Sequence, residues 1–228
     1  MSGEGEAMPA AAMPAAAPRS ASRVALALRR LVAHQLGRIG LVVLLLMGIA
    51  AIAAPVLAPY DPTLQDYTAM LAGPSLAHPF GTDDIGRDVL SRVIFGTRIS
   101  LQVISVSVSA ALLLGSLIGL VAGYAGGWVD HVVMRVMDGL LAFPMLVLAL
   151  AIIAVLGPAL INAIIAIAIV NVPGFVRLVR GQVLAVRQLD HVQAARSLGA
   201  PRWRIILFHI WPKLVGHVIV YASLRASA

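Results

Sequence analysis

The feature that most constrains this chain is a set of long apolar runs that carry no charge. From Gly139 to Val176 there is no charged residue, and in the whole chain 12% of residues are charged while 60% are hydrophobic. A soluble domain carries about a quarter charged residues, and a single soluble core cannot bury runs of this length. About 20 apolar residues cross the hydrocarbon core of a bilayer as a helix. The sequence therefore predicts an all-α, polytopic membrane helix bundle.

The alternation of apolar and polar segments predicts four complete spans and an incomplete fifth. Gly157-Pro158 divides the long uncharged run, because proline disfavours helical geometry in the residue before it. Residues 1–34 are expected to be a disordered, Ala/Pro-rich tail, and residues 35–228 to be the transmembrane domain. The expected spans cover residues 38–59, 99–124, 132–156, 159–176 and, incomplete, 212–228.

The distribution of charge predicts the orientation of the spans. The tail from Arg19 to Arg38 has five basic residues and no acid, and residues 177–213 have seven basic residues and one acid. The loop 60–97 instead has five Asp and two Arg. Because cytoplasmic loops are enriched in Lys and Arg, the N-terminus and residues 177–213 are expected in the cytoplasm and the loop outside. Basic residues that flank apolar spans also argue against nucleic-acid binding, despite the net charge of +7.

The residue types needed for enzyme chemistry are sparse. The chain has no Cys, no His-Glu-x-x-His and no Gly-x-x-x-x-Gly-Lys-[Ser/Thr], so it has neither a thiolate nor a recognisable metal or nucleotide-phosphate motif. An intramembrane serine protease would have to rely on residues such as Ser105 and His217, without a Gly-x-Ser-x-Gly motif. We therefore expect no catalytic, metal or cofactor site in this chain.

Three local patterns predict contacts. Gly115, Gly119 and Gly123 recur every fourth residue, which predicts a helix face for close packing, although glycine is also frequent in membrane helices generally. Arg135 and Asp138 are three residues apart, which predicts a local ion pair. The acidic residues Asp83, Asp84 and Asp88 indicate a solvated acidic loop, with a weak cation site as the alternative.

Residues 190–213 predict a helix–turn–helix on the cytoplasmic side. Good helix formers from His191 to Leu198 are followed by Gly199, which suits a helix C-terminus, and Pro201 suits the first turn of a second helix over 201–210. On these residues alone, docking to a partner and a basic amphipathic helix on anionic lipid, anchored by Trp203, are equal alternatives.

The same segment resembles the EAA loop of ABC importer permeases. In that family the short helix of the loop docks in a groove of the ATPase subunit and transmits its closure to the membrane helices. This chain has Gln193 where the family usually has Glu, so an ionic contact with the ATPase would be weaker here. It also has Trp211 where the family usually has Leu. The resemblance implies coupling residues Gln193, Ala194, Ala195, Arg196, Gly199, Ile210 and Pro212.

Two further stretches resemble the dipeptide/oligopeptide/nickel permease family of the DppC/OppC type. Residues 78–101 look like the segment that leads into the second span of that family, and residues 123–144 match it as well. The resemblance covers about residues 35–220 and implies a multi-pass, ABC importer type I permease fold in the bacterial inner (plasma) membrane. The motif before the second span comprises Gly81, Thr82, Asp83, Gly86, Arg87 and Asp88.

The resemblance implies a permease subunit of an ATP-driven importer for peptides or related small solutes. The implied partners are a second permease subunit, two ABC ATPase subunits that hold ATP and Mg²⁺, an extracytoplasmic solute-binding protein and membrane lipid. The chain itself would bind no cofactor and catalyse no reaction. Family members continue through a sixth span, so an end at Ala228 predicts a C-terminal truncation. A non-transporting remnant or assembly partner of such a complex is therefore the alternative.

Overall fold

A computed structural model describes residues 32–227, so most of the predicted tail lies outside the described residues. The chain divides into two compact units, residues 1–49 and residues 50–228, and every contact discussed below lies within the second. In the described residues the regular elements are all helical. They are α2 (Gln35–Leu57), the 3₁₀ turn η1 (Tyr67–Ala69), α3 (Val89–Ala125), α4 (Gly127–Leu141), α5 (Met145–Leu156), α6 (Leu160–Val186), α7 (Asp190–Ser197), α8 (Arg202–Arg204), the π-helical turn η2 (Ile205–Ile210) and α9 (Trp211–Ala226).

Four helical segments in the described residues are long and apolar enough to cross a membrane, which confirms the predicted all-α membrane fold. They are α2, α3, α6 and the continuous helical run Arg202–Ala226. Helix α3 has 37 residues, about 55 Å at helical rise, and so extends beyond a hydrocarbon core of about 30 Å. Its first turns, with Arg92 and Arg98, precede the span expected from residue 99.

The stretch expected as one span over 132–156 is a bent pair of helices, which together are long and apolar enough for one span. Helices α4 and α5 meet at 91° across a break of a few residues. Pro144 lies at this break with φ −55° and ψ 132°, immediately before α5. A proline disfavours helical geometry in the residue before it, so α4 ends and α5 starts in a new direction.

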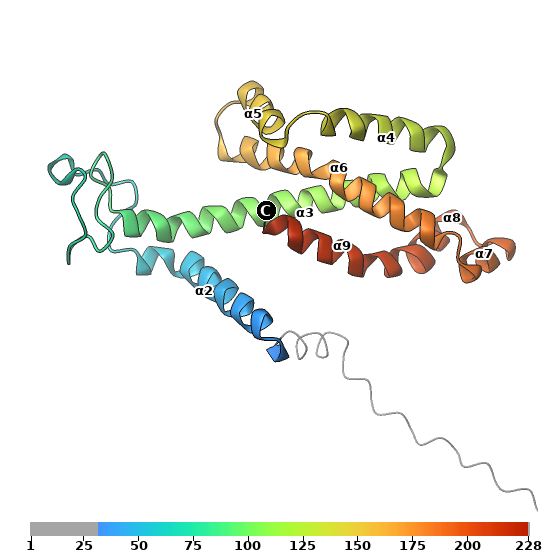
Figure 1. The fold of residues 1–228 in the computed structure, drawn as a ribbon, viewed down its shortest axis with the longest axis horizontal. Coiled ribbons are helices and arrows are strands. Elements are labelled where there is room, and N and C mark those ends of the chain that lie inside the picture. Colours follow the sequence, from blue (N-terminus) through green and yellow to red (C-terminus); the bar gives the residue numbers. More distant parts are fainter. Residues whose placement is uncertain (1–31, 228) are drawn as a thin grey trace, which may run out of the picture. The chain divides into compact units, whose positions relative to one another are not determined.

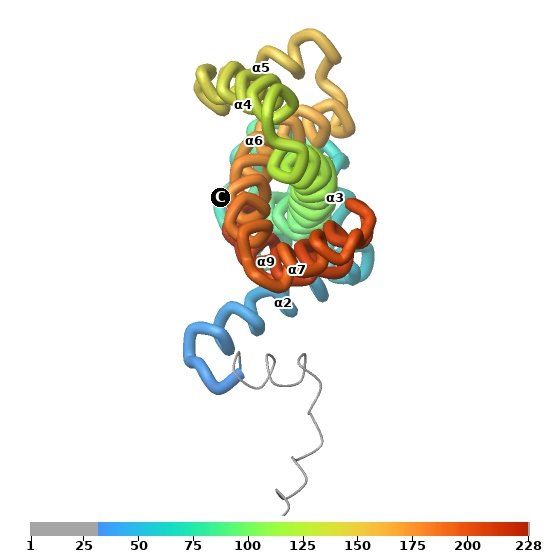
Figure 2. Tube along the Cα trace, turned by 90° about the vertical axis from the view of Figure 1, so that its right-hand side faces the viewer, coloured from blue at the N-terminus to red at the C-terminus, as the bar shows by residue number. Residues whose placement is uncertain are grey.

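Helices α3 and α6 form the centre of the second unit and run in the same direction (Figures 1 and 2). Gly115 of α3 lies against Phe175 of α6, and Gly123 lies against Val183 further along both helices. A Cβ atom placed at either glycine, or at Gly119 between them, would lie 2.5–2.9 Å from an atom of α6. The close packing predicted from the glycine repeat is therefore confirmed.

Helix α9 packs against both α3 and α6 (Figure 2). Two apolar clusters hold these helices together. The first joins α3, α4 and α6 through Ala111, Met137, Val172, Phe175 and Val176. The second, here called the end cluster, joins α6, α7, η2 and α9 through Val179, Val183, Val186, Val192, Ile205, Ile210, Leu214 and Val218. The short helix α7 is thus attached to the membrane helices by its own buried side chain.

Candidate functional site

The candidate coupling segment begins where α6 ends and includes α7, α8 and η2 (Figure 1). Val192 of α7 is 3% exposed and belongs to the end cluster together with Ile205 and Ile210. Most other side chains of α7 are exposed. Helix α7 is therefore fixed to the bundle on one face and open on the other.

The turn after α7 depends on Gly199, which has φ +79°. The N–H of Gly199 donates to the carbonyl of Arg196 at 3.0 Å, and the N–H of Ala200 donates to the carbonyl of Ala195 at 3.1 Å. This pair of bonds is the Schellman arrangement, in which the left-handed position favours glycine. The predicted helix end at Gly199 is confirmed.

The helix after this turn differs from the expected one over 201–210, because it continues without a break into α9. Pro212 lacks an N–H, and its ring would crowd the carbonyl four residues earlier in a regular α-helix. The preceding turn, η2, is instead π-helical, and the N–H of Trp211 bonds to the carbonyl of Ile206. The wider turn accommodates the proline, so the coupling segment and α9 form one helical run.

The residues expected to couple to an ATPase fall into two groups. The exposed group comprises Gln193, Ala194, Arg196, Gly199 and Pro212, and Ala195 is half-buried. The Gln193 side-chain amide donates to the carbonyl of Arg187 at 3.3 Å. Ile210 is fully buried in the end cluster, so it supports the exposed surface from beneath rather than forming part of it.

Ion pairs between α4 and α6 were not predicted from the sequence. Arg180 forms two bonds to Asp130, one of them Nη2–Oδ2 at 2.5 Å, and Arg177 bonds to Asp138 at 2.6 Å. The predicted pair of Arg135 with Asp138 is wrong, because α6 brings Arg177 to that carboxylate. The sequence signal was two arginines in a largely apolar α6, but spacing along the chain could not identify their partners.

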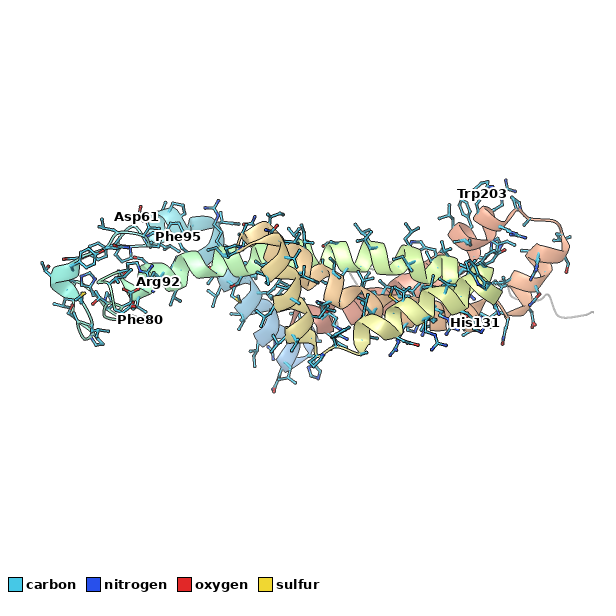
Figure 3. The ribbon with its side chains drawn as sticks, turned by 90° about the horizontal axis from the view of Figure 1, so that it is seen from above. Asp61, Phe80, Arg92, Phe95, His131 and Trp203 are labelled. Carbon is cyan, nitrogen blue, oxygen red and sulfur yellow. The ribbon has the colours of Figure 1, made fainter. Side chains whose placement is uncertain are left out.

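The motif residues before the second span hold together a folded loop, residues 58–88, here called the cap. Gly86 has φ +79°, and a Cβ there would lie 1.7 Å from the carbonyl oxygen of Asp66. Thr82 is buried, donates to the carbonyl of Ala69, and accepts the N–H of Ala72 at 2.9 Å. The cap lies at the opposite end of α3 from α7 (Figure 1), and Figure 3 shows Phe80 and Arg92 at that end. The motif therefore has a structural role in closing the cap.

Two cap carboxylates are engaged within the protein rather than solvated as predicted. Asp83 accepts the backbone N–H of Arg87 at 2.9 Å and its Nε at 2.7 Å, and also bonds Arg92. Asp88 caps α3 by accepting the N–H of Ser91 at 2.8 Å, and it bonds His78 Nδ1 at 2.9 Å. Among residues 32–227 no group of three or more His, Cys, Asp or Glu is placed to hold a metal ion.

The cap is expected to lose stability at low pH. Burial raises the pKa of Asp83, but hydrogen bonds from Arg87 and Ile85 and the charge of Arg87 outweigh it and lower the pKa to about 2. The unfolded value is about 3.9, so ionised Asp83 stabilises the fold fully above that pH, and this contribution is lost as pH falls through about 2. Between pH 4 and 2, circular dichroism should show the thermal midpoint falling less for Asp83→Asn than for the parent.

Asp84→Asn is the matched control, because Asp84 is exposed and the substitution removes the same charge one residue away. This variant should follow the pH dependence of the parent. Asp88 also has a lowered pKa, because bonds from Ser91 and His78 outweigh its burial, so Asp83→Asn should reduce the pH dependence without removing it. Equal pH dependence in all three proteins would contradict the role given to Asp83.

Comparison with known proteins identifies the family. The profile described as "Binding-protein-dependent transport system inner membrane component" matches residues 115–228, and that of the "N-terminal TM domain of oligopeptide transport permease C" matches residues 22–74. The chain is 44% identical over 198 residues to the dipeptide transport system permease protein DppC of Alkalihalophilus pseudofirmus, with 87% of this chain and 65% of the relative covered.

Two other relatives give the same picture. The glutathione transport system permease protein GsiD of Pectobacterium atrosepticum is 45% identical over 187 residues, 82% of this chain and 62% of the relative. The probable D,D-dipeptide transport system permease protein DdpC of Escherichia coli is 49% identical over 183 residues, 80% of this chain and 61% of the relative. The chain thus spans less than two thirds of the length of these three relatives. It belongs to the binding-protein-dependent transport system inner membrane components, among the dipeptide/oligopeptide ABC permeases.

Proposed function

We propose that this chain acts as a permease subunit of an ATP-driven importer for peptides or related small solutes. The observation that carries the proposal is the attachment of α7. Its outer face is exposed, while Val192 on its inner face packs in the end cluster with side chains of α6 and α9. A short helix held in this way can pass a displacement from a bound partner to two membrane helices. The named transport of dipeptides and glutathione by relatives supports the solute class.

In the proposed mechanism the chain contributes a bundle with two arrangements, and ATP binding elsewhere shifts the balance between them. ATP and Mg²⁺ would be held by two separate ATPase subunits, one of which contacts α7, and a second permease subunit would complete the pathway. A solute-binding protein would deliver the solute on the side of the cap. The cap and α7 lie at opposite ends of α3, which supports an extracytoplasmic cap and a cytoplasmic α7 (Figure 1). The N-terminus would be cytoplasmic as well.

The coupling role is tested at Gly199, which lies outside the apolar clusters. Gly199→Pro replaces φ +79° by about −65° and removes the N–H that bonds Arg196, so the end of α7 should be displaced. In proteoliposomes with the partner permease, both ATPases and the binding protein, ATP-driven uptake should fall about tenfold or more, the effect of 1.4 kcal/mol or above. ATP hydrolysis should persist, because the ATPase sites are untouched.

Gly199→Asn is the matched control, because asparagine tolerates the left-handed conformation and retains the N–H. It should transport at close to the parent rate. Uptake by Gly199→Pro at the parent rate would show that α7 does not couple ATP hydrolysis to transport. Absence of stoichiometric co-purification of the parent chain with the ATPases, together with absent uptake, would favour the non-transporting remnant or assembly partner.

A further inference from the structure

A polar hollow of about 550 Å³ lies between the ends of α3 and α6 and the inner side of α7. No acidic side chain of the described residues lines it, so three guanidinium groups set its charge. The polar side chains of its lining are Tyr124, Arg187, Gln188, Gln193, Arg196 and Arg202. Two of the expected coupling residues, Gln193 and Arg196, line this hollow, while Ala194, Gly199 and Pro212 do not.

The three arginines are arranged to attract an anion. Arg187 is half-buried, and its Nη1 donates to the carbonyl of Gly123 at 3.0 Å. That bond fixes the guanidinium and offsets the negative partial charge at the end of α3, which would otherwise oppose an anion. Arg196 and Arg202 are exposed and form no ion pair within residues 32–227. Guanidinium groups match phosphate oxygens through paired N–H donors, which favours a phosphate-bearing ligand.

The position of the hollow indicates where such a ligand comes from. It is formed at the ends of α3 and α6, which are long and apolar enough to span a membrane, and the ends of such helices reach the depth of the lipid headgroups. Trp203, next to Arg202, is exposed, as are Leu207 and Phe208 on the same helical run. Tryptophan is enriched at the membrane–water interface, and basic pockets between membrane helices at this depth bind anionic headgroups. Figure 3 shows Trp203 at the end of the unit opposite Phe80 and Arg92.

We propose that this hollow binds a phosphate-bearing anion through Arg187, Arg196 and Arg202, and that in the membrane the anion is the headgroup of an anionic phospholipid. The lipid chains would lie along the exposed apolar surface beside Trp203. Binding needs neither ATP nor a partner subunit. Partner docking and lipid binding were alternatives for this segment on sequence grounds. On this proposal Arg196 binds the anion, and Ala194, Gly199 and Pro212, which do not line the hollow, stay available for docking.

The test uses the full chain in detergent and native mass spectrometry. Phosphatidylglycerol and phosphatidylcholine with the same acyl chains are titrated against the parent and against the double variant Arg196→Gln/Arg202→Gln. The parent should bind phosphatidylglycerol more tightly than phosphatidylcholine. The double variant should lose about thirtyfold in phosphatidylglycerol affinity, because each basic residue near a membrane surface contributes about 1 kcal/mol. Both substituted residues are exposed, so the fold should survive.

The matched control is Arg135→Gln/Arg204→Gln, which removes two exposed charges that do not line the hollow. It should bind phosphatidylglycerol like the parent. A further arm replaces lipid by sodium phosphate, compared with sodium chloride at equal ionic strength. Phosphate binding that depends on Arg196 and Arg202 and displaces phosphatidylglycerol would support the anion site but assign it to a soluble phosphate.

Three results would overturn the proposal. The first is an equal loss of affinity in the control variant, which would indicate attraction by overall charge. The second is equal binding of the two lipids with no phosphate binding. The third is unchanged phosphatidylglycerol binding in Arg196→Gln/Arg202→Gln together with lost ATPase co-purification, which would assign the hollow to an acidic side chain of the partner. None of these results depends on transport, so failure here leaves the proposed importer function open to its own test.

Discussion

Gly119→Leu is expected to prevent α3 from packing against α6, so that the purified chain is no longer monodisperse or thermally stable. A Cβ at Gly119 would lie 2.8 Å from the carbonyl oxygen of Val176 and 2.9 Å from the Cβ of Val179. Backbone atoms of α6 cannot yield as a flexible side chain would, so the two helices must separate. Even Gly119→Ala should cost about 1–3 kcal/mol, the usual range for overpacking a close contact. Thermal unfolding in detergent, followed by size-exclusion chromatography, measures both variants.

Gly96→Leu is the matched control for this prediction. Gly96 lies in the same helix, and a Cβ there meets no atom within 4 Å. The substitution should leave stability unchanged or raise it by up to about 1 kcal/mol, because glycine is a poor helix former. Similar losses at residues 96 and 119 would show that the effect arises from leucine in α3 rather than from the contact with α6.

Asp130→Ala is expected to give the second large loss of stability, because it leaves the partly buried guanidinium of Arg180 without its partner. The Asp130 side chain is 13% exposed and that of Arg180 is 28% exposed. Breaking a fully buried pair costs about 3–5 kcal/mol, and the partial exposure of Arg180 reduces this to on the order of 2 kcal/mol. The thermal midpoint of the purified chain should fall accordingly.

Two further variants separate this effect from a general loss of charge. Asp138→Ala breaks the ion pair with Arg177, in which both side chains are about half exposed. This substitution should cost no more than about 1 kcal/mol of stability. Asp130→Ala/Arg180→Leu removes both charges and should recover part of the loss, because an apolar pair needs no partner. A double variant as unstable as the single one would show that Asp130 acts through some other contact.

The membrane fold and several helix ends could be predicted because they depend on local patterns. The uncharged run from residue 139 to 176 requires lipid, and Gly199 marks a helix end through its own backbone freedom. The repeat of Gly115, Gly119 and Gly123 predicts a packing face without naming the partner. In each case the signal lies within one continuous stretch of the sequence.

What could not be predicted depends on contacts between distant segments. Asp138 is three residues from Arg135 but bonds Arg177, and the packing of α4 on α6 decides between them. Asp83 belongs to a group of acidic residues that is typical of a solvated loop. Its bonds to Arg87 and Arg92 depend on the folding of the cap, which the sequence pattern does not show. The placement of the exposed coupling residues is visible in the structure, while their contact with an ATPase stays a prediction.

The π-helical turn at Ile205–Ile210 carries a consequence for insertions and deletions. A π turn contains one more residue than the α-helical turn it replaces. The side chains after it therefore point in the same directions as they would in a regular α-helix that is one residue shorter. Deleting one residue inside this turn, combined with Pro212→Ala to remove the ring that needs the wider turn, would convert it to a regular turn and leave Leu214 and Val218 directed at the same neighbours. Deleting one residue within α9 itself would rotate all later side chains by about 100° and turn that apolar face away from α6. Length variation in this helical run should therefore be tolerated at the π turn when Pro212 is replaced, and not within α9.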